Sequence, residues 1–175
     1  FEEDKKLIEL PSAVFNLSAN ELHRLSNVDI APAINTIPGV RMEVRSPGSY
    51  RLNIRGSSLR APFGVRNVKV YYNGIPFTDP GGDTYLNQFS LNDYGSLQVI
   101  KGPSGSIYGA GTGGVVLLNS PLRKMADSLT DIRLQYTAGS YNRQSVNASV
   151  KWGEGNLQNR ISYSDMKSDG YRDQS

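Results

Sequence analysis

The sequence of 175 residues predicts an α+β fold, in which a small mixed β-sheet with short helices is followed by three antiparallel strands. Short segments of alternating apolar and polar residues are separated by turns along the whole chain, which contains 18 Gly and 9 Pro. Only two segments carry the signals of a helix start. Ten Tyr, against five Phe and one Trp, favour half-buried strands whose hydroxyls reach water.

Composition limits the classes of protein to which the chain can belong. The net charge is +3, but Lys and Arg are interspersed with acidic residues, so no nucleic-acid partner is expected. The absence of Cys excludes disulfides, thiolate metal sites and Cys nucleophiles. No run reaches the roughly 20 apolar residues of a membrane-spanning helix. Membrane strands are not excluded by this, because each needs only about 9–11 alternating residues. The first residues are not a signal peptide, so the protein is either not exported or already processed.

Two short strands and a short helix are predicted at the start of the chain. The strands cover residues 7–10 and 13–17, because the proline between them cannot donate to a central strand ladder. Ser18 and Glu21 have the spacing of a capping box, which predicts a helix over residues 19–25.

A second short helix is expected to begin at Asp29 and to end before Gly39, with Pro32 tolerated in its first turn. After it the hydrophobic period changes to two. Residues 40–45 alternate apolar and charged side chains, and residues 50–55 repeat the pattern after a turn. The positions predicted to face inward are Val40, Met42, Val44, Leu52 and Ile54.

The next strand is predicted over residues 67–72 and runs into Asn73-Gly74, a strong hairpin signal because both residues tolerate positive φ. Residues 77–88 contain Pro-Gly-Gly and are expected to form a solvent loop. Two further strands, over residues 97–101 and 115–118, enclose a Gly-rich stretch.

A linker over residues 122–130 is predicted to separate a first unit, residues 1–121, from a second, residues 131–175. The second unit has the pattern of a three-stranded meander with one apolar and one polar face. In a soluble sandwich the apolar face would be the core, and in an outer-membrane barrel it would face lipid; the alternation alone does not separate the two. The apolar face is formed by Ile132, Leu134, Tyr136, Val146, Ala148, Val150, Trp152, Leu157, Ile161 and Tyr163.

Three glycines in the Gly-rich stretch, Gly109, Gly111 and Gly114, match the G-x-G-x-x-G pattern of dinucleotide-binding folds. That pattern must open a helix, whereas residues 115–118 are β-prone and too short for a crossover helix. We therefore expect these glycines to permit turns or a close approach of the backbone, and no cofactor is expected.

Four segments have an order and spacing that point to one family. They are Pro38-Gly39-Val40, the Leu-Asn-Ile-Arg-Gly of residues 52–56, the hairpin of residues 68–76, and residues 97–116 with Lys101-Gly102-Pro103-Ser104, Ile107-Tyr108-Gly109 and Gly113-Gly114. Together they resemble the plug domain of TonB-dependent outer-membrane receptors, over residues 7–121.

The resemblance implies that residues 1–121 form the plug and residues 131–175 the first three antiparallel strands of a transmembrane β-barrel. Three strands cannot close a barrel, so the chain is expected to be part of a longer protein. Ile132, Leu134, Tyr136, Val146 and Val150 would then face lipid. Gln98 stands where members often carry an acid and Lys101 where many carry Arg, and residues 1–4 contain no convincing TonB box.

The function implied by the resemblance is binding and uptake rather than catalysis. It is that of a receptor in the outer membrane of a Gram-negative bacterium, which imports a scarce ligand, most often a ferric siderophore or another iron chelate. The implied partners are TonB with its inner-membrane energising complex and the lipid around the barrel. Two alternatives remain open, a soluble β-rich ligand-binding module in the periplasm and a nucleotide-dependent enzyme.

Residue roles follow from the same resemblance. Plug–barrel contacts are expected at Arg55 and Lys101. Apical plug loops over residues 57–66 and 77–88 offer groups suited to an anionic chelate or a glycan: Ser57, Arg60, Phe63, Arg66, Thr78, Asp79, Asp83 and Tyr85. The structural motif residues are Gly56, Gly74, Gly102, Pro103, Tyr108, Gly109, Gly113 and Gly114.

His23 is the only histidine, and it is expected to be an exposed residue of the first helix rather than a metal ligand or a catalytic base. No acidic calcium loop and no nucleophile elbow is present in the sequence. Neither a metal site nor a catalytic site is therefore predicted.

Overall fold

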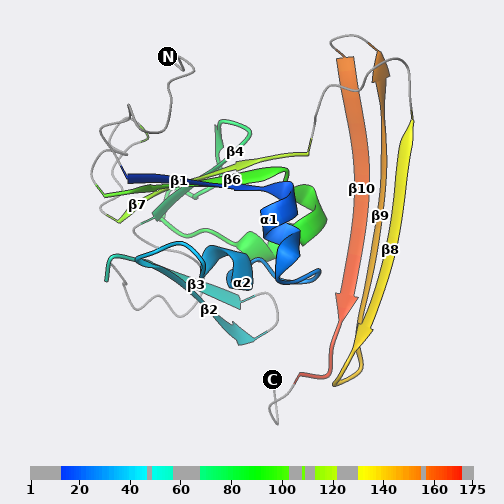
Figure 1. The fold of residues 1–175 in the computed structure, drawn as a ribbon, viewed down its shortest axis with the longest axis horizontal. Helices are drawn as coiled ribbons and strands as arrows, with labels where there is room; N and C mark the ends of the chain where they lie inside the picture. Colours follow the sequence, from blue (N-terminus) through cyan, green and yellow to red (C-terminus); the bar gives the residue numbers. More distant parts are fainter. Residues whose placement is uncertain are drawn as a thin grey trace.

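The computed structural model describes residues 13–46, 49–56, 68–102, 108, 113–121, 130–154 and 157–170. The part of the chain up to residue 121, here called the N-terminal unit, contains two sheets and short helices. The strands after residue 130 form a separate three-stranded sheet, here called the C-terminal sheet. It stands along one side of the N-terminal unit, next to α1 (Figure 1).

The larger sheet of the N-terminal unit has five strands in the order β1-β6-β7-β4-β5. Only β4 and β7 pair in parallel, and the other neighbours are antiparallel, which confirms the predicted small mixed sheet. The strands are β1 (Ala13–Ser18), β4 (Val68–Tyr72), β5 (Ile75–Pro76), β6 (Ser96–Lys101) and β7 (Gly114–Asn119). Asn73 and Gly74 join β4 to β5 with φ of 49° and 77°, as a tight hairpin requires.

The smaller sheet pairs β2 (Val40–Ser46) with β3 (Ser49–Ile54), and it packs against the second of two short helices. The predicted capping box of α1 (Ala19–Arg24) is confirmed, since the Ser18 hydroxyl accepts from the Glu21 N–H and Glu21 accepts from the Ser18 N–H at 2.8 Å. The second helix, α2 (Ala31–Ile34), is shorter than predicted at both ends. It starts after Asp29, whose carboxylate accepts from the Ala31 N–H, and it ends at Ile34, after which the N–H groups of Thr36 and Ile37 donate three residues back. None of the helices in the described ranges has the length and hydrophobicity of a membrane span.

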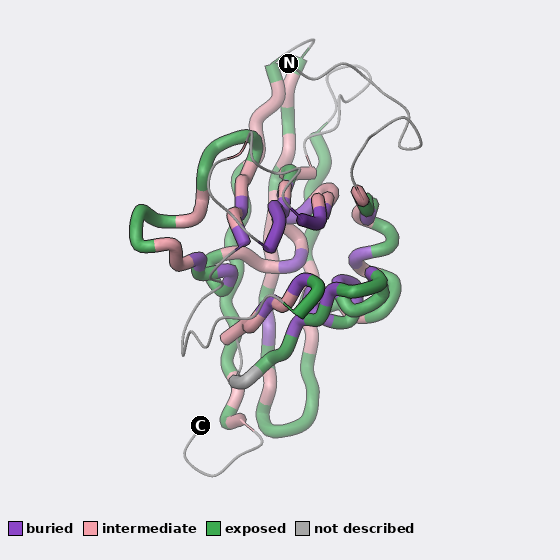
Figure 2. The backbone as a smooth tube through the Cα atoms, turned by 90° about the vertical axis from the view of Figure 1, so that its left-hand side faces the viewer, coloured by how far each residue is buried: buried purple, intermediate pink, exposed green. Residues whose placement is uncertain are grey.

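The hydrophobic core lies between the two sheets and the helices of the N-terminal unit, where the buried stretches gather (Figure 2). Leu22 of α1, Ile34 of α2 and Ile54 of β3 have at most 1% of their surface exposed. Four of the five predicted inward positions of β2 and β3 are buried. The fifth, Val44, is 37% exposed and pairs with Tyr50 near the turn end of its hairpin.

Residues 77–88 form the predicted loop with an exposed tip, but parts of the segment are buried, which the sequence did not predict. The segment folds back on β4, where the Thr78 hydroxyl accepts from the Val70 N–H and pairs with the Thr84 hydroxyl, both at 2.8 Å. Thr84 is 1% exposed, and the segment ends in a 3-10 helix, η2 (Leu86–Gln88). Two hydrophobic residues account for the buried parts, because Leu86 lies in the core and Phe77 packs against it.

The C-terminal sheet is the predicted antiparallel meander of β8 (Asp131–Gly139), β9 (Arg143–Glu154) and β10 (Leu157–Lys167), with β9 in the centre. Its register aligns Ile132, Val150 and Ile161 across the three strands on one face. That apolar face points away from the N-terminal unit, and these three side chains are 36–65% exposed. The polar face is turned inward.

We predict that Gly114→Ala destabilises the chain far more than Gly74→Ala. Gly114 has φ of +139°, and a Cβ there would clash with the Ile100 carbonyl oxygen of the neighbouring strand, so we expect a loss of about 3 kcal/mol. At Gly74 no atom lies within 4 Å of an added Cβ, so the substitution causes no clash. The expected loss is about 1 kcal/mol, because alanine is disfavoured at the left-handed φ of +77°. Urea unfolding of both variants measures the difference, and equal midpoints would contradict the packing of β6 on β7.

Candidate functional site

The two parts of the chain meet at a short turn that precedes β6. This turn is the 3-10 helix η3 (Leu91–Asp93), which follows Ser90. The Ser90 N–H and hydroxyl both donate to Oδ2 of Asp93 at 3.0 Å, which forms a capping box around the turn. One oxygen of the Asp93 carboxylate is therefore engaged locally, and the other, Oδ1, is left to face the C-terminal sheet.

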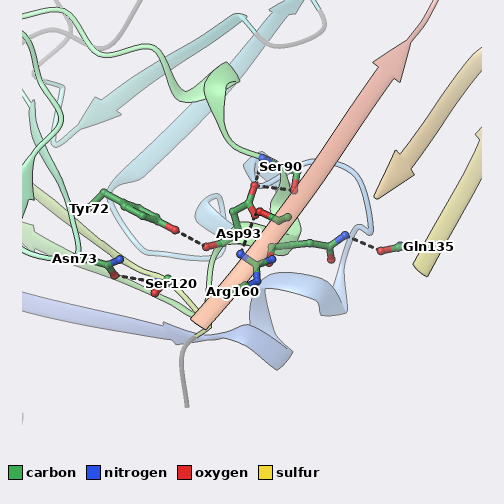
Figure 3. Close-up of polar contacts among 9 residues, drawn as sticks. Tyr72, Asn73, Ser90, Asp93, Ser120, Gln135 and Arg160 are labelled. Atoms are coloured by element: carbon green, nitrogen blue, oxygen red, sulfur yellow. Dashed lines mark hydrogen bonds and ion pairs between the residues drawn. The ribbon is translucent and has the colours of Figure 1, made fainter. Parts of the chain in front are cut away.

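Arg160 of β10 binds this turn with two parallel hydrogen bonds. Its Nη1 donates to Oδ1 of Asp93 at 3.0 Å, and its Nη2 donates to the Asn92 carbonyl oxygen at 2.9 Å (Figure 3). Ser162, two residues further along β10, donates its hydroxyl to the same Oδ1 at 3.0 Å. The side chains of Arg160 and Asp93 are only 12% and 13% exposed, so this is a largely buried ion pair with its hydrogen bonds satisfied.

Two further contacts extend the polar interface on either side. The Asn92 amide donates to Oε1 of Gln135 on β8 at 2.8 Å, so the turn contacts both outer strands of the C-terminal sheet. Behind the turn, the Tyr72 hydroxyl of β4 donates to the Asp93 carbonyl oxygen at 3.2 Å, and the Tyr72 ring stacks on Phe89 with centroids 4.5 Å apart. The turn is thereby fixed to the core on one side and to two strands on the other.

The electrostatics of the site favour a charged Asp93. Burial raises the pKa of its carboxyl, but hydrogen bonds from Ser90, Ser162 and Arg160 outweigh burial and lower that pKa below its ordinary value of 3.8. Burial, followed by the negative charge of Asp93, raises the pKa of Tyr72. The Tyr72 hydroxyl therefore keeps its proton and remains a donor at neutral pH.

His23 was predicted to be an exposed residue of the first helix, but it lies at the same interface. It is half-buried on α1, and its pKa is lowered by burial and then by the positive charge of Arg133 on β8. The sequence places it correctly on a helix, but the sheet that covers that helix comes from the other end of the chain.

The candidate ligand residues of the loop at 77–88 occupy different environments. Asp79 and Tyr85 are exposed, whereas Thr78 is half-buried and bonded to Val70 and Thr84. Oδ1 of Asp79 accepts from the Asp83 N–H at 2.9 Å, which closes the loop tip. Asp79 and Tyr85 present groups to solvent, while the Thr78 hydroxyl supports the loop; a role in ligand binding stays a prediction for all four residues.

Arg55 and Lys101 lie close together in the N-terminal unit. The Lys101 amine donates to the Pro38 carbonyl oxygen at 2.8 Å and sits over the Phe15 ring, 4.2 Å from its centroid. Gly102 leaves room for the guanidinium of Arg55 beside it. Their contact with a barrel wall stays a prediction.

The remaining predicted residues fall into two groups. Gly56, Gly102, Gly113 and Tyr108 are described, and the Tyr108 carbonyl oxygen accepts from the Tyr71 hydroxyl at 2.6 Å. The strand at 7–10 lies outside the described residues, as do Ser57, Arg60, Phe63, Arg66, Pro103 and Gly109. Most of the predicted linker at 122–130 also lies outside them, so the domain division stays a prediction.

Within the described ranges no three Asp, Glu or His side chains gather as a metal site.

Sequence reasoning missed the interface residues altogether. One signal was present, because Ser90 and Asp93 have the S-x-x-D spacing of a capping box. Another was Arg160, a charged residue on the polar face of β10. Neither signal names the partner, since Asp93 and Arg160 are 67 positions apart in the sequence.

The family of the chain follows from its similarity to known protein families. A family model described as the TonB-dependent receptor plug domain matches residues 6–116, which is more than half of the chain. The chain belongs to the TonB-dependent receptor plug family. Its N-terminal unit therefore contains the plug domain of this family.

Solved receptors share the fold over nearly the whole chain. The siderophore receptor PirA from Acinetobacter baumannii matches with a TM-score of 0.64 and 18% identity over 89% of this chain and 24% of PirA. The copper transporter OprC matches at 0.70 and 19%, over 91% and 25%. FpvA from Pseudomonas aeruginosa PAO1, an outer-membrane receptor bound to pyoverdine, matches at 0.65 and 21%, over 91% and 23%. The chain therefore spans about a quarter of each of these proteins, and at such identity the likeness concerns the fold.

Replacement of Asp93 by Asn is expected to lower the free energy of unfolding by about 2–3 kcal/mol at neutral pH, because Arg160 loses its buried partner. Since the pKa of Asp93 is lowered in the folded state, its contribution is present above about pH 4 and is lost as the pH falls through the folded value. The difference in free energy of unfolding between the parent and Asp93→Asn should thus become smaller as the pH is lowered.

Glu43→Gln is the matched control, because the Glu43 ion pair with Arg41 is exposed and is expected to be worth at most about 1 kcal/mol. Chemical denaturation at neutral and acidic pH measures the free energy of unfolding of the parent and of both variants. An Asp93→Asn variant no less stable than the control would refute the interface described above.

Proposed function

We propose that this chain forms the plug and the first three barrel strands of an outer-membrane receptor that imports a metal chelate by TonB-dependent active transport. The observation that carries the proposal is the orientation of the C-terminal sheet. Its polar face packs on the plug through Arg160, Ser162 and Gln135, and its apolar face points outward. This is the polarity of a barrel strand that has a plug inside and lipid outside.

The exposed apolar face supports lipid contact over a soluble module. Leu134, Leu157 and Ile161 are 77%, 69% and 65% exposed, although a soluble sandwich would bury them as its core. A contiguous apolar surface of this kind marks a membrane or protein contact. The remaining large members of the face are Ile132, Tyr136, Val146, Val150, Trp152 and Tyr163, each 36% exposed or more.

The nature of the cargo is proposed from the solved neighbours. PirA is a siderophore receptor, FpvA is an outer-membrane receptor bound to pyoverdine, and OprC is a copper transporter. A ferric chelate is therefore the first candidate and a copper species the second. Of the ligand residues predicted in the described loop, Asp79 and Tyr85 are the exposed ones and are proposed to contact such a ligand.

The expected partners are TonB and the lipid around the barrel. The family of the plug supports TonB as the source of energy, and the polar interface supports a plug that rearranges during transport. Hydrogen bonds and ion pairs across an interface can be exchanged for water, whereas a packed apolar core is costly to open.

The orientation of the sheet predicts that Leu134→Arg lowers the amount of receptor in the outer membrane, because Arg in the lipid layer costs about 2–4 kcal/mol at mid-depth. Thr137→Arg is the matched control on the same strand, since Thr137 lies on the polar face opposite Ser145. Quantification of both variants in outer-membrane fractions tests this. Equal loss of both variants, or of neither, would argue against lipid contact at Leu134.

The proposed cargo predicts that cells lacking the gene take up less of one metal chelate. Radioactive iron supplied as citrate or as a hydroxamate or pyoverdine complex, and radioactive copper supplied as its free salt, are the probes. Restored uptake of one probe by the wild-type gene, and its loss again when TonB is removed, would support transport. Unchanged uptake of every metal probe would contradict the proposed cargo and leave the fold assignment intact.

A further inference from the structure

The side-chain amide of Gln158, on β10, is buried on the same face of the strand as Arg160. Its Oε1 and Nε2 each expose less than 1 Å² to solvent, and neither has a hydrogen-bond partner among the described residues. A buried amide without a partner costs free energy, and native proteins satisfy nearly all such groups. The Gln158 amide therefore marks a place where a further hydrogen-bonding group is expected.

Gly153 of β9 makes room for this amide. The two residues are paired across the strands, and a Cβ at position 153 would lie 3.0 Å from Nε2 of Gln158 and would clash with the Leu157 carbonyl oxygen. Glycine in a strand often marks such a close approach of another group. The Gln158 side chain is thus packed against β9.

A cleft of about 570 Å³ adjoins Gln158 and lies between β10 and the plug. This volume is within the range of about 300–1,000 Å³ that is usual for small-molecule sites. On the plug side the cleft is bordered by residues of β4, the β4–β5 turn, η2 and the segment after β7, three of which are labelled in Figure 3: Tyr72, Asn73, Gln88 and Ser120.

The charged groups at this cleft neutralise each other. Asp93 and Arg160 are the only Asp, Glu, Lys or Arg residues among the described residues that border it, and they form the ion pair described above. The guanidinium also donates to the Asn92 carbonyl oxygen, and the carboxylate also accepts from Ser90 and Ser162. A charged ligand would bring a charge without a counterion, which is costly to bury, so the cleft favours a neutral ligand.

The other polar groups suit a ligand that is rich in hydroxyls. Amides and hydroxyls both donate and accept hydrogen bonds, and here they include those of Gln88, Gln158, Ser120 and Ser164. Adjacent hydroxyls of a sugar ring also donate and accept, so they match both atoms of the Gln158 amide. Phe89 is the only apolar residue among the described residues that border the cleft, which gives carbon surface to a sugar ring but no pocket for the apolar side chains of a peptide.

We propose that this cleft is a second ligand site of the protein, which binds a short neutral saccharide through the amides of Gln158 and Gln88. Asp79 and Tyr85, the residues proposed above to contact a metal chelate, do not border the cleft, so the two sites are separate. The inference goes beyond the proposed function, because it adds a neutral ligand to a receptor for a metal chelate.

Four neutral disaccharides are the probes: maltose, trehalose, sucrose and diacetylchitobiose. Their binding to the full-length receptor, purified in a detergent without a sugar head group, is measured by saturation-transfer NMR with titration. At least one should bind the parent protein. Gln158→Leu removes the amide and nearly keeps the side-chain volume, so it is expected to weaken binding of that disaccharide at least about tenfold, because several hydrogen bonds are lost together.

Two further variants make the test specific. Gln88→Leu should weaken binding less, since Gln88 is exposed, and it carries the test if Gln158→Leu fails to fold. Gln144→Leu is the matched control, because Gln144 lies on β9 outside the cleft, and it should bind the disaccharide as the parent does.

The contrary outcomes are distinct from a failure of the receptor function. If no disaccharide binds the parent, or if Gln158→Leu and Gln88→Leu both bind as the parent does, the saccharide site is refuted. Binding that is lost in Tyr85→Ala and kept in Gln158→Leu would place the saccharide at the loop and refute it as well. In each case metal uptake and the presence of the receptor in the outer membrane are measured separately, so the proposed function stands or fails on its own.

Discussion

The ion pair between Asp93 and Arg160 fixes which face of the C-terminal sheet meets the plug. An alternating sheet can turn either face inward, and burial of apolar area alone would favour the apolar one. Here the carboxylate is held by Ser90, accepts from Arg160 and Ser162, and stays charged because these donors outweigh the effect of burial. The apolar face is consequently left outside, and the interpretation as barrel strands depends on that orientation.

The plug itself is held together in the opposite way, by a conventional apolar core. Leu22, Ile34, Ile54 and Leu97 are almost wholly buried between two sheets and two short helices, and Gly114 allows β7 to approach β6 closely. The close-packed apolar core maintains the fold of the plug. The hydrogen bonds between the plug and the C-terminal sheet lie outside that core and can be replaced by hydrogen bonds to water.

Local structure could be predicted from the sequence because its causes are local. The capping box at Ser18, the hairpin at Asn73-Gly74 and the alternation of β8–β10 each depend on neighbouring residues, and each is confirmed. The burial of Thr84 within the loop at 77–88 and of half of His23 was not predicted, because both come from tertiary contacts, with β4 and with a sheet distant in the sequence. The Asp93–Arg160 pair was missed for the same reason, because nothing in one sequence links positions 67 residues apart.

Trp152 tests the orientation of the sheet most directly, because it is the only tryptophan of the chain and lies on β9, on the same face as Val150. The measurement is the fluorescence of the purified chain in a detergent with brominated acyl chains, compared with the same detergent without bromine. The account predicts strong quenching by bromine and weak quenching by aqueous acrylamide. Fluorescence unaffected by the brominated chains would mean that protein or water, and not lipid, meets the apolar face, which would contradict the account.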